Sequence, residues 1–221
     1  MWYVCRKTTK EEMEEKKLTE KESLELITNM IQQTKKDSAI GSGDTFLIWG
    51  YLCVLCSLSV VAMACFAGGG RWGWLYFAIP VLGFAVAGIN ARRLKKKYSA
   101  PATYSASSIN NIWACLSFVL AAYAIRCLMD WHSPAGWSGM FLLGLLLPAI
   151  GTYSTGVILK EKLLQVCGMV GVILGSMFLH KLCCEGPIVT IKWPIIMAIS
   201  MVITLVVPGH YLNYKSRKQN S

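Results

Sequence analysis

The sequence predicts an all-α polytopic membrane protein, with six transmembrane helices arranged as three serial helical hairpins and preceded by a cytoplasmic amphipathic helix. Of the 221 residues, 54% are hydrophobic and only 15% are charged, whereas charged residues make up about a quarter of an average soluble domain. From Thr45 onward, long apolar stretches alternate with short connectors, and the lysines and arginines concentrate in every second connector. A bilayer explains both patterns, because about 20 apolar residues span its core and Lys/Arg-rich loops stay in the cytoplasm.

The N-terminal segment, residues 1–44, is polar. Thr19 and Glu22 are spaced as a capping box, in which each side chain bonds the free backbone N–H of the other residue. Apolar residues then recur at helical spacing, which predicts an amphipathic helix over about residues 20–35. Such a helix could lie on the inner membrane surface, cover the cytoplasmic ends of the spans, or stand solvated before the first span.

Six apolar stretches fill the predicted transmembrane domain, residues 45–211, and a basic tail follows over residues 212–221. The predicted spans are Thr45–Phe66, Trp72–Ala91, Ile109–Met129, Gly136–Leu159, Leu163–Leu182 and Ile188–Tyr211. The connectors after the second and fourth spans are basic, as are the N-terminal segment and the tail, while the other connectors hold few charges. This alternation predicts that both termini are cytoplasmic.

The second and fourth spans share a spaced motif, which indicates duplicated hairpins. Pro80, Gly83 and Gly88 in the second span recur as Pro148, Gly151 and Gly156 in the fourth. An Ile-Trp pair, Ile48-Trp49 or Ile112-Trp113, opens the span before each of them. The alternative is chance, because proline and glycine are common in membrane helices.

The most polar intramembrane stretch follows Pro148. A proline within a span frees a backbone carbonyl, which neighbouring hydroxyl groups can satisfy. Seven residues of the second and fourth spans are therefore candidates for lining a small cavity or for packing helices together: Pro80, Gly83, Pro148, Gly151, Thr152, Ser154 and Thr155. Packing through small residues is the simpler expectation.

No catalytic residue, metal site or cofactor site is predicted. The central part of each predicted span lacks Asp, Glu, Lys, Arg and His, which argues against an ion-coupled carrier. The segment Gly136-Trp137-Ser138-Gly139 resembles the nucleophile motif of rhomboid intramembrane proteases. That family needs a histidine in its sixth span at the depth of the serine, and His210 lies near the opposite end of the span.

The chain has nine cysteines, and a group of them falls at the predicted outer ends of the spans. This group comprises Cys65, Cys127, Cys183 and Cys184, with His180 and Glu185 nearby. The sequence allows three interpretations of this group: one disulfide, a metal site, or free buried thiols.

The predicted cytoplasmic face carries the candidate contact residues, which are mostly basic. They are Arg92, Arg93, Lys95, Lys96, Lys97, His210, Asn213 and Lys215. Their position beside membrane-embedded ends fits anionic lipid rather than nucleic acid. We expect a non-enzymatic accessory or interaction subunit, whose partners are the lipid bilayer and an unidentified membrane or cytoplasmic protein. The alternative is a small-molecule transporter or channel with a path along the proline-kinked second and fourth spans.

Both ends of the chain resemble one family. Residues 18–27 and 41–51, and the ending Pro208–Lys215, resemble the corresponding parts of small six-span membrane proteins of Bacteroidales-type bacteria. The middle of the chain fits that family only in general layout. The resemblance implies a bacterial inner membrane location and similarity to accessory proteins encoded beside small transcriptional regulators, and it implies no activity.

Overall fold

A computed structural model describes residues 24, 25, 28, 42–66, 72–97, 104–130, 133–186 and 192–220 of the chain. Of the predicted amphipathic helix over residues 20–35, the three described residues are helical and the others lie outside the described part. The chain divides into two compact units, Met1–Asp37 and Ser38–Ser221, and the helices from Ser42 onward belong to the second.

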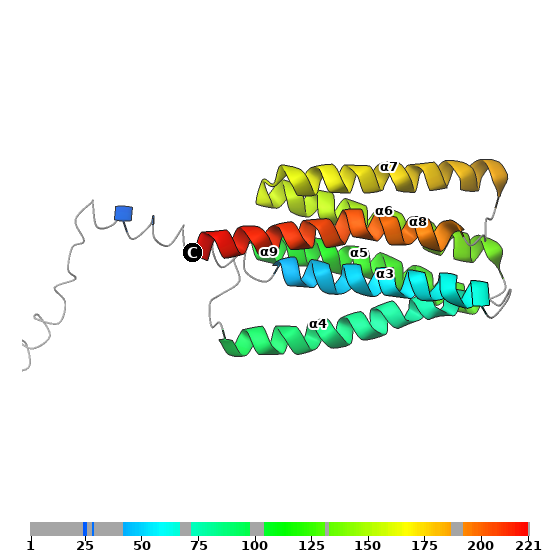
Figure 1. The fold of residues 1–221 in the computed structure, drawn as a ribbon, viewed down its shortest axis with the longest axis horizontal. Coiled ribbons are helices and arrows are strands. Elements are labelled where there is room, and N and C mark those ends of the chain that lie inside the picture. Colours follow the sequence, from blue (N-terminus) through cyan, green and yellow to red (C-terminus); the bar gives the residue numbers. More distant parts are fainter. Residues whose placement is uncertain are drawn as a thin grey trace, which may run out of the picture. The chain divides into compact units, whose positions relative to one another are not determined.

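The described residues after residue 41 fold into helices, without a strand among them (Figure 1). In chain order they are α3 (Ser42–Phe66), the 3₁₀ segment η1 (Trp72–Phe77), α4 (Ala78–Lys97), α5 (Tyr104–Met129), α6 (Pro134–Leu159), α7 (Lys162–Glu185), α8 (Lys192–Met201), the π-helical turn η2 (Val202–Val206) and α9 (Val207–Asn220). Five helices in the described part are long and apolar enough to cross a membrane, the last running unbroken over Lys192–Lys218. The predicted all-α class is confirmed for these residues.

The second predicted span differs from its expected form. Instead of one α-helix over Trp72–Ala91, the 3₁₀ segment η1 leads directly into α4. Pro80 is the third residue of α4. The preceding segment η1 ends at Phe77, so the change of helix type lies three residues before this proline. The proline kink expected inside this span stays a prediction.

The final helix continues past the predicted end of the sixth span. Instead of ending at Tyr211, α9 runs through the predicted tail to Asn220. The irregular part lies earlier, where η2 widens the helix just before Pro208. A π-helical turn commonly accommodates such a break in the regular hydrogen-bond pattern.

Neighbouring helices pack antiparallel through glycines. Gly83 of α4 lies against the Trp49 ring of α3, and nearer the other end of the pair the Tyr76 hydroxyl donates to Ser57 Oγ at 3.2 Å. In the next pair, Gly151 of α6 lies against the Trp113 ring of α5. A Cβ atom at Gly151 would come within 2.9 Å of that indole.

Helices α6 and α7 approach each other closely through glycines. Three glycines of α7 meet α6 in turn, with Gly168 against Tyr153, Gly171 against Ala149 and Gly175 against Leu146. Small residues at a shared face let two membrane helices approach closely. These helices belong to different predicted hairpins, so this close packing lies between hairpins.

The first and last helices also lie side by side. Gly50 of α3 meets Val206 of η2, and Gly209 of α9 meets Leu47 of α3. The packed core combines residues of α3, α6, α7 and the last helix, including Phe46, Leu145, Leu164, Phe178 and Met201. In Figure 1, the start of α3, the α6–α7 junction and α9 lie at the same end.

Candidate functional site

Three of the predicted contact residues, His210, Asn213 and Lys215, lie on α9, and each bonds another part of the bundle. The Tyr51 hydroxyl and His210 Nε2 are 2.7 Å apart, and Asn213 Nδ2 donates to Asp44 Oδ1 at 2.7 Å. Lys215 Nζ pairs with Glu161 Oε1. The three α9 residues, their partners Tyr51, Asp44 and Glu161, and Tyr211 together form what we call the α9 polar cluster. It ties α9 to α3 and to the α6–α7 junction.

Glu161 is the centre of one half of this cluster. Its side chain is only 15% exposed, and its second oxygen, Oε2, accepts a hydrogen bond from the Tyr211 hydroxyl at 3.1 Å. Its first oxygen, Oε1, pairs with Lys215, one turn further along α9. Both carboxylate oxygens of Glu161 are thus engaged by α9.

The α6–α7 junction itself is a tight turn. Lys160 caps α6 in a left-handed conformation, with φ 56°, and the Glu161 amide donates to the Gly156 carbonyl at 2.8 Å. Gln165 Nε2 donates to the same carbonyl at 3.1 Å. The side chains of Lys160 and Lys162, on either side of Glu161, are exposed. The turn therefore holds its acid inward and presents its two lysines outward.

Sequence reasoning identified the α9 residues but missed their partners. A signal was present, because only four acidic residues follow residue 43: Asp44, Asp130, Glu161 and Glu185. Each of the four has a partner, since Asp130 pairs with Arg126 and Glu185 with Lys181. An acid retained in an otherwise basic turn indicates a specific partner.

The other predicted contact residues are at the end of α4. Arg92, Arg93, Lys95, Lys96 and Lys97 belong to that helix, but their side chains lie outside the described residues.

The predicted cavity or packing residues divide between packing and exposed positions. Thr152 and Thr155 are buried with their hydroxyls bound: Thr155 donates to the Gly151 carbonyl at 2.7 Å and accepts from Trp113 Nε1 at 3.1 Å. Gly83 and Gly151 are buried against tryptophan rings, whereas Ser154 and Pro148 are half-buried and Pro80 is exposed.

Thr152 bonds a backbone carbonyl that lies four residues before a proline in the last helix. Its hydroxyl donates to the Thr204 carbonyl at 2.8 Å, and the regular α-helical donor to that carbonyl would be residue 208. Residue 208 is proline, which has no N–H. The predicted use of hydroxyls to satisfy a freed carbonyl thus occurs at Pro208 of α9, while the sequence argument had placed it beside Pro148.

The segment Gly136-Trp137-Ser138-Gly139 lies in the first turns of α6. The helix begins at Pro134, and Ser133 Oγ accepts the Gly136 amide at 3.3 Å as its cap. Ser138 is buried, and Gly139 lies against the hydroxyl of Tyr123. The glycine at position 139 therefore has a packing explanation.

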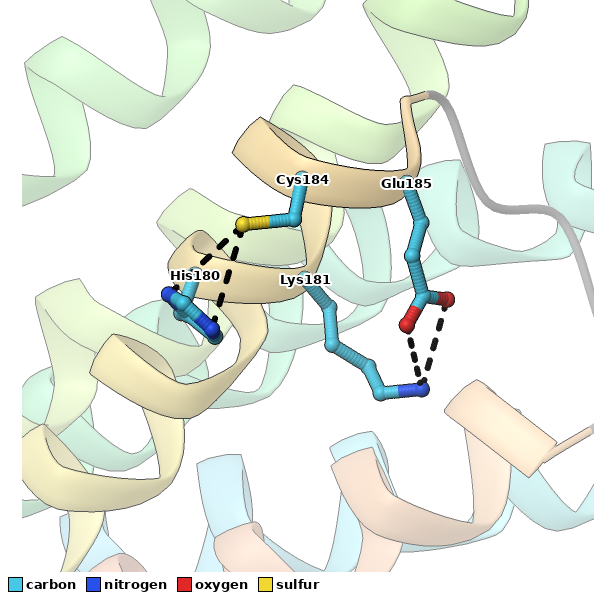
Figure 2. Close-up of polar contacts among 4 residues, drawn as sticks. All are labelled: His180, Lys181, Cys184 and Glu185. Atoms are coloured by element: carbon cyan, nitrogen blue, oxygen red, sulfur yellow. Dashed lines mark hydrogen bonds and ion pairs between the residues drawn. The ribbon is translucent and has the colours of Figure 1, made fainter.

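The opposite end of α7 carries two of the four cysteines of the predicted group, Cys183 and Cys184, and Figure 2 shows Cys184 with its neighbours. Cys184 Sγ lies 3.8 Å from His180 Nε2, and Lys181 pairs with Glu185 at 3.1 Å. The cysteines in the described part are free thiols, including Cys65 and Cys127. No set of three or more His, Cys, Asp or Glu residues in that part could hold a metal ion.

Comparison of the chain with protein-family models, with curated proteins and with solved structures found no match.

Proposed function

We propose that the chain is a six-span protein of the bacterial inner membrane that acts as a non-enzymatic accessory subunit, contacting a partner protein through the cytoplasmic end of α9. The observation that carries this proposal is the α9 polar cluster. It fixes a helix that continues to Asn220, roughly 13 Å beyond Tyr211 at 1.5 Å per residue. Tyr214, 67% exposed, projects from this held helix.

The path of the chain supports six crossings. Asp44 at the start of α3 bonds Asn213 near the end of α9. A chain that enters and leaves a bundle at the same end crosses an even number of times. Five long apolar helices therefore need a sixth, and α4 is the element that can supply it. The basic residues at this end then favour a cytoplasmic location for both termini.

The paired tryptophan–glycine contacts support duplicated hairpins. Trp49 on Gly83 and Trp113 on Gly151 join equivalent members of the shared motif in two successive helix pairs. The recurrence of this contact favours duplication over a chance occurrence of proline and glycine. The resemblance at both chain ends supports the bacterial inner membrane as the location.

The transporter alternative receives no comparable support. It relied on a polar path along the second and fourth spans. Pro80 lies in the first turn of α4, and the buried hydroxyls of Thr152 and Thr155 bond backbone groups in helix contacts.

Site-specific photo-crosslinking in native membranes tests the proposed contact. A photoreactive amino acid replaces Tyr214 in the full chain, and Met129, 83% exposed near the opposite end of the bundle, receives the same replacement as a control. We expect a discrete cross-linked protein from position 214 and none of that mass from position 129. Equal cross-linking at the two positions, or none at 214, would refute the partner contact.

A further inference from the structure

The two exposed lysines of the α6–α7 junction carry uncompensated charge. Glu161 between them gives both carboxylate oxygens to Tyr211 and Lys215. Neither Lys160 nor Lys162 forms an ion pair with any residue in the described part of the chain. The junction with Lys215 thus sets three lysines against one buried carboxylate, leaving an outward positive surface that we call the junction lysine site.

Lys160 occupies a backbone conformation that favours another residue. Its φ of 56° lies in the left-handed region, where helix C-caps are usually glycine because a Cβ atom is disfavoured there. A lysine at such a position costs stability relative to glycine. Residues kept in a disfavoured conformation often serve a function, and the exposed ammonium group is the feature that glycine would lack.

The position of the junction identifies the occupant. It lies between the end of α6 at Leu159 and the start of α7 at Lys162, two helices apolar enough to cross a membrane. Such a turn lies at the depth of lipid headgroups. Lysines near that surface attract anionic lipids, and a phosphodiester is the negative group found at this depth.

We propose that the junction lysine site, Lys160 and Lys162 beside Lys215, binds the phosphate of an anionic phospholipid headgroup. The proposal rests on the membrane placement proposed above, but it is independent of the protein partner. The headgroup would sit on the lysines of the turn, while the last turns of α9 project past it.

Titration with defined lipids tests the site. Full-length protein in an uncharged detergent is titrated with phosphatidylglycerol, with phosphatidylcholine as the zwitterionic comparison, and bound lipid is counted by native mass spectrometry. Loss of both charges in Lys160→Gln/Lys162→Gln should weaken phosphatidylglycerol binding by roughly 25-fold, at about fivefold per lysine. Lys192→Gln removes an exposed charge at the opposite end of the last helix and should leave binding unchanged.

A second variant separates binding from folding. Lys160→Gly relieves the left-handed conformation, so its melting temperature should equal or exceed that of the unaltered protein while phosphatidylglycerol affinity falls about fivefold. Equal binding of phosphatidylcholine, or an equal loss in Lys192→Gln, would overturn the site. So would inorganic phosphate raising the melting temperature as phosphatidylglycerol does, since the site would then serve a soluble anion. The Tyr214 cross-linking result does not depend on these outcomes, so the two proposals can fail separately.

Discussion

The indole of Trp49 lies directly against Gly83, so that any side chain at residue 83 would overlap the ring. Trp113 lies on Gly151 in the same way, one helix pair later in the chain. The contact matters because a membrane interior offers little hydrophobic drive between helices, and close van der Waals packing must hold them together.

Adding one methyl group should therefore have opposite effects at two glycines of α4. Gly83→Ala must displace the Trp49 ring, and overpacking of this kind costs about 1–3 kcal/mol. At Gly88 a Cβ atom would meet nothing within 4 Å, so Gly88→Ala should be neutral or stabilising by up to about 1 kcal/mol. Thermal unfolding in detergent compares the two variants. Equal melting temperatures would mean that the tryptophan contact does not hold the helices.

The bond from Thr152 to the Thr204 carbonyl should depend on Pro208. Thr152→Val removes the hydroxyl that donates to the Thr204 carbonyl and should cost about 1–2 kcal/mol of unfolding free energy. Pro208→Ala supplies an N–H to that carbonyl, so the Thr152→Val change should cost less in that background. A double-mutant cycle measures the difference. Strictly additive effects would show that the hydroxyl does not compensate for the proline.

The Glu161–Lys215 pair should contribute more to stability than the Lys181–Glu185 pair. The Glu161 side chain is 15% exposed, whereas both side chains of the other pair are more than half exposed. A double-mutant cycle with Glu161→Gln and Lys215→Gln should give a coupling of about 0.5–1.5 kcal/mol, against about 0–0.5 kcal/mol for Lys181 and Glu185. The reverse order would contradict the role of Glu161 in fixing α9.

Reporter fusions should detect an even number of crossings. Because Asp44 bonds Asn213, a fluorescent protein after Ser221 and another before Met1 should both report the cytoplasm. Alkaline phosphatase fused after Glu185 should be active outside it. Phosphatase activity after Ser221 would indicate five crossings and would exclude α4 as a span.

The positions of the helices could be predicted in large part from local pattern. Hydropathy over about 20 residues located α3, α6 and α7 to within a few residues, because an apolar stretch of that length is a property of consecutive residues. Hydropathy did not reveal that the second span begins as a 3₁₀ segment, because helix type is not a property of composition. It also did not reveal that the last helix continues past Tyr211, where polarity rises.

The sequence identified the α9 residues of the candidate site but not the residues that bond them. His210, Asn213 and Lys215 could be chosen from their position beside a membrane end, but Tyr51, Asp44 and Glu161 could not be assigned to them. The residues of the His210 and Asn213 pairs are more than 150 positions apart, and local spacing does not report such contacts.

The sequence alone determined that this chain forms long apolar helices with basic residues concentrated at alternate ends, because composition and period are local properties. Tertiary structure decided which groups those helices bring together: tryptophan on glycine, Thr152 on the Thr204 carbonyl before Pro208, and the α9 residues Asn213 and Lys215 on Asp44 and Glu161. Those choices depend on the close approach of distant segments. Where two segments approach closely, a glycine leaves room for an aromatic ring, and a backbone carbonyl accepts a bond from a nearby hydroxyl.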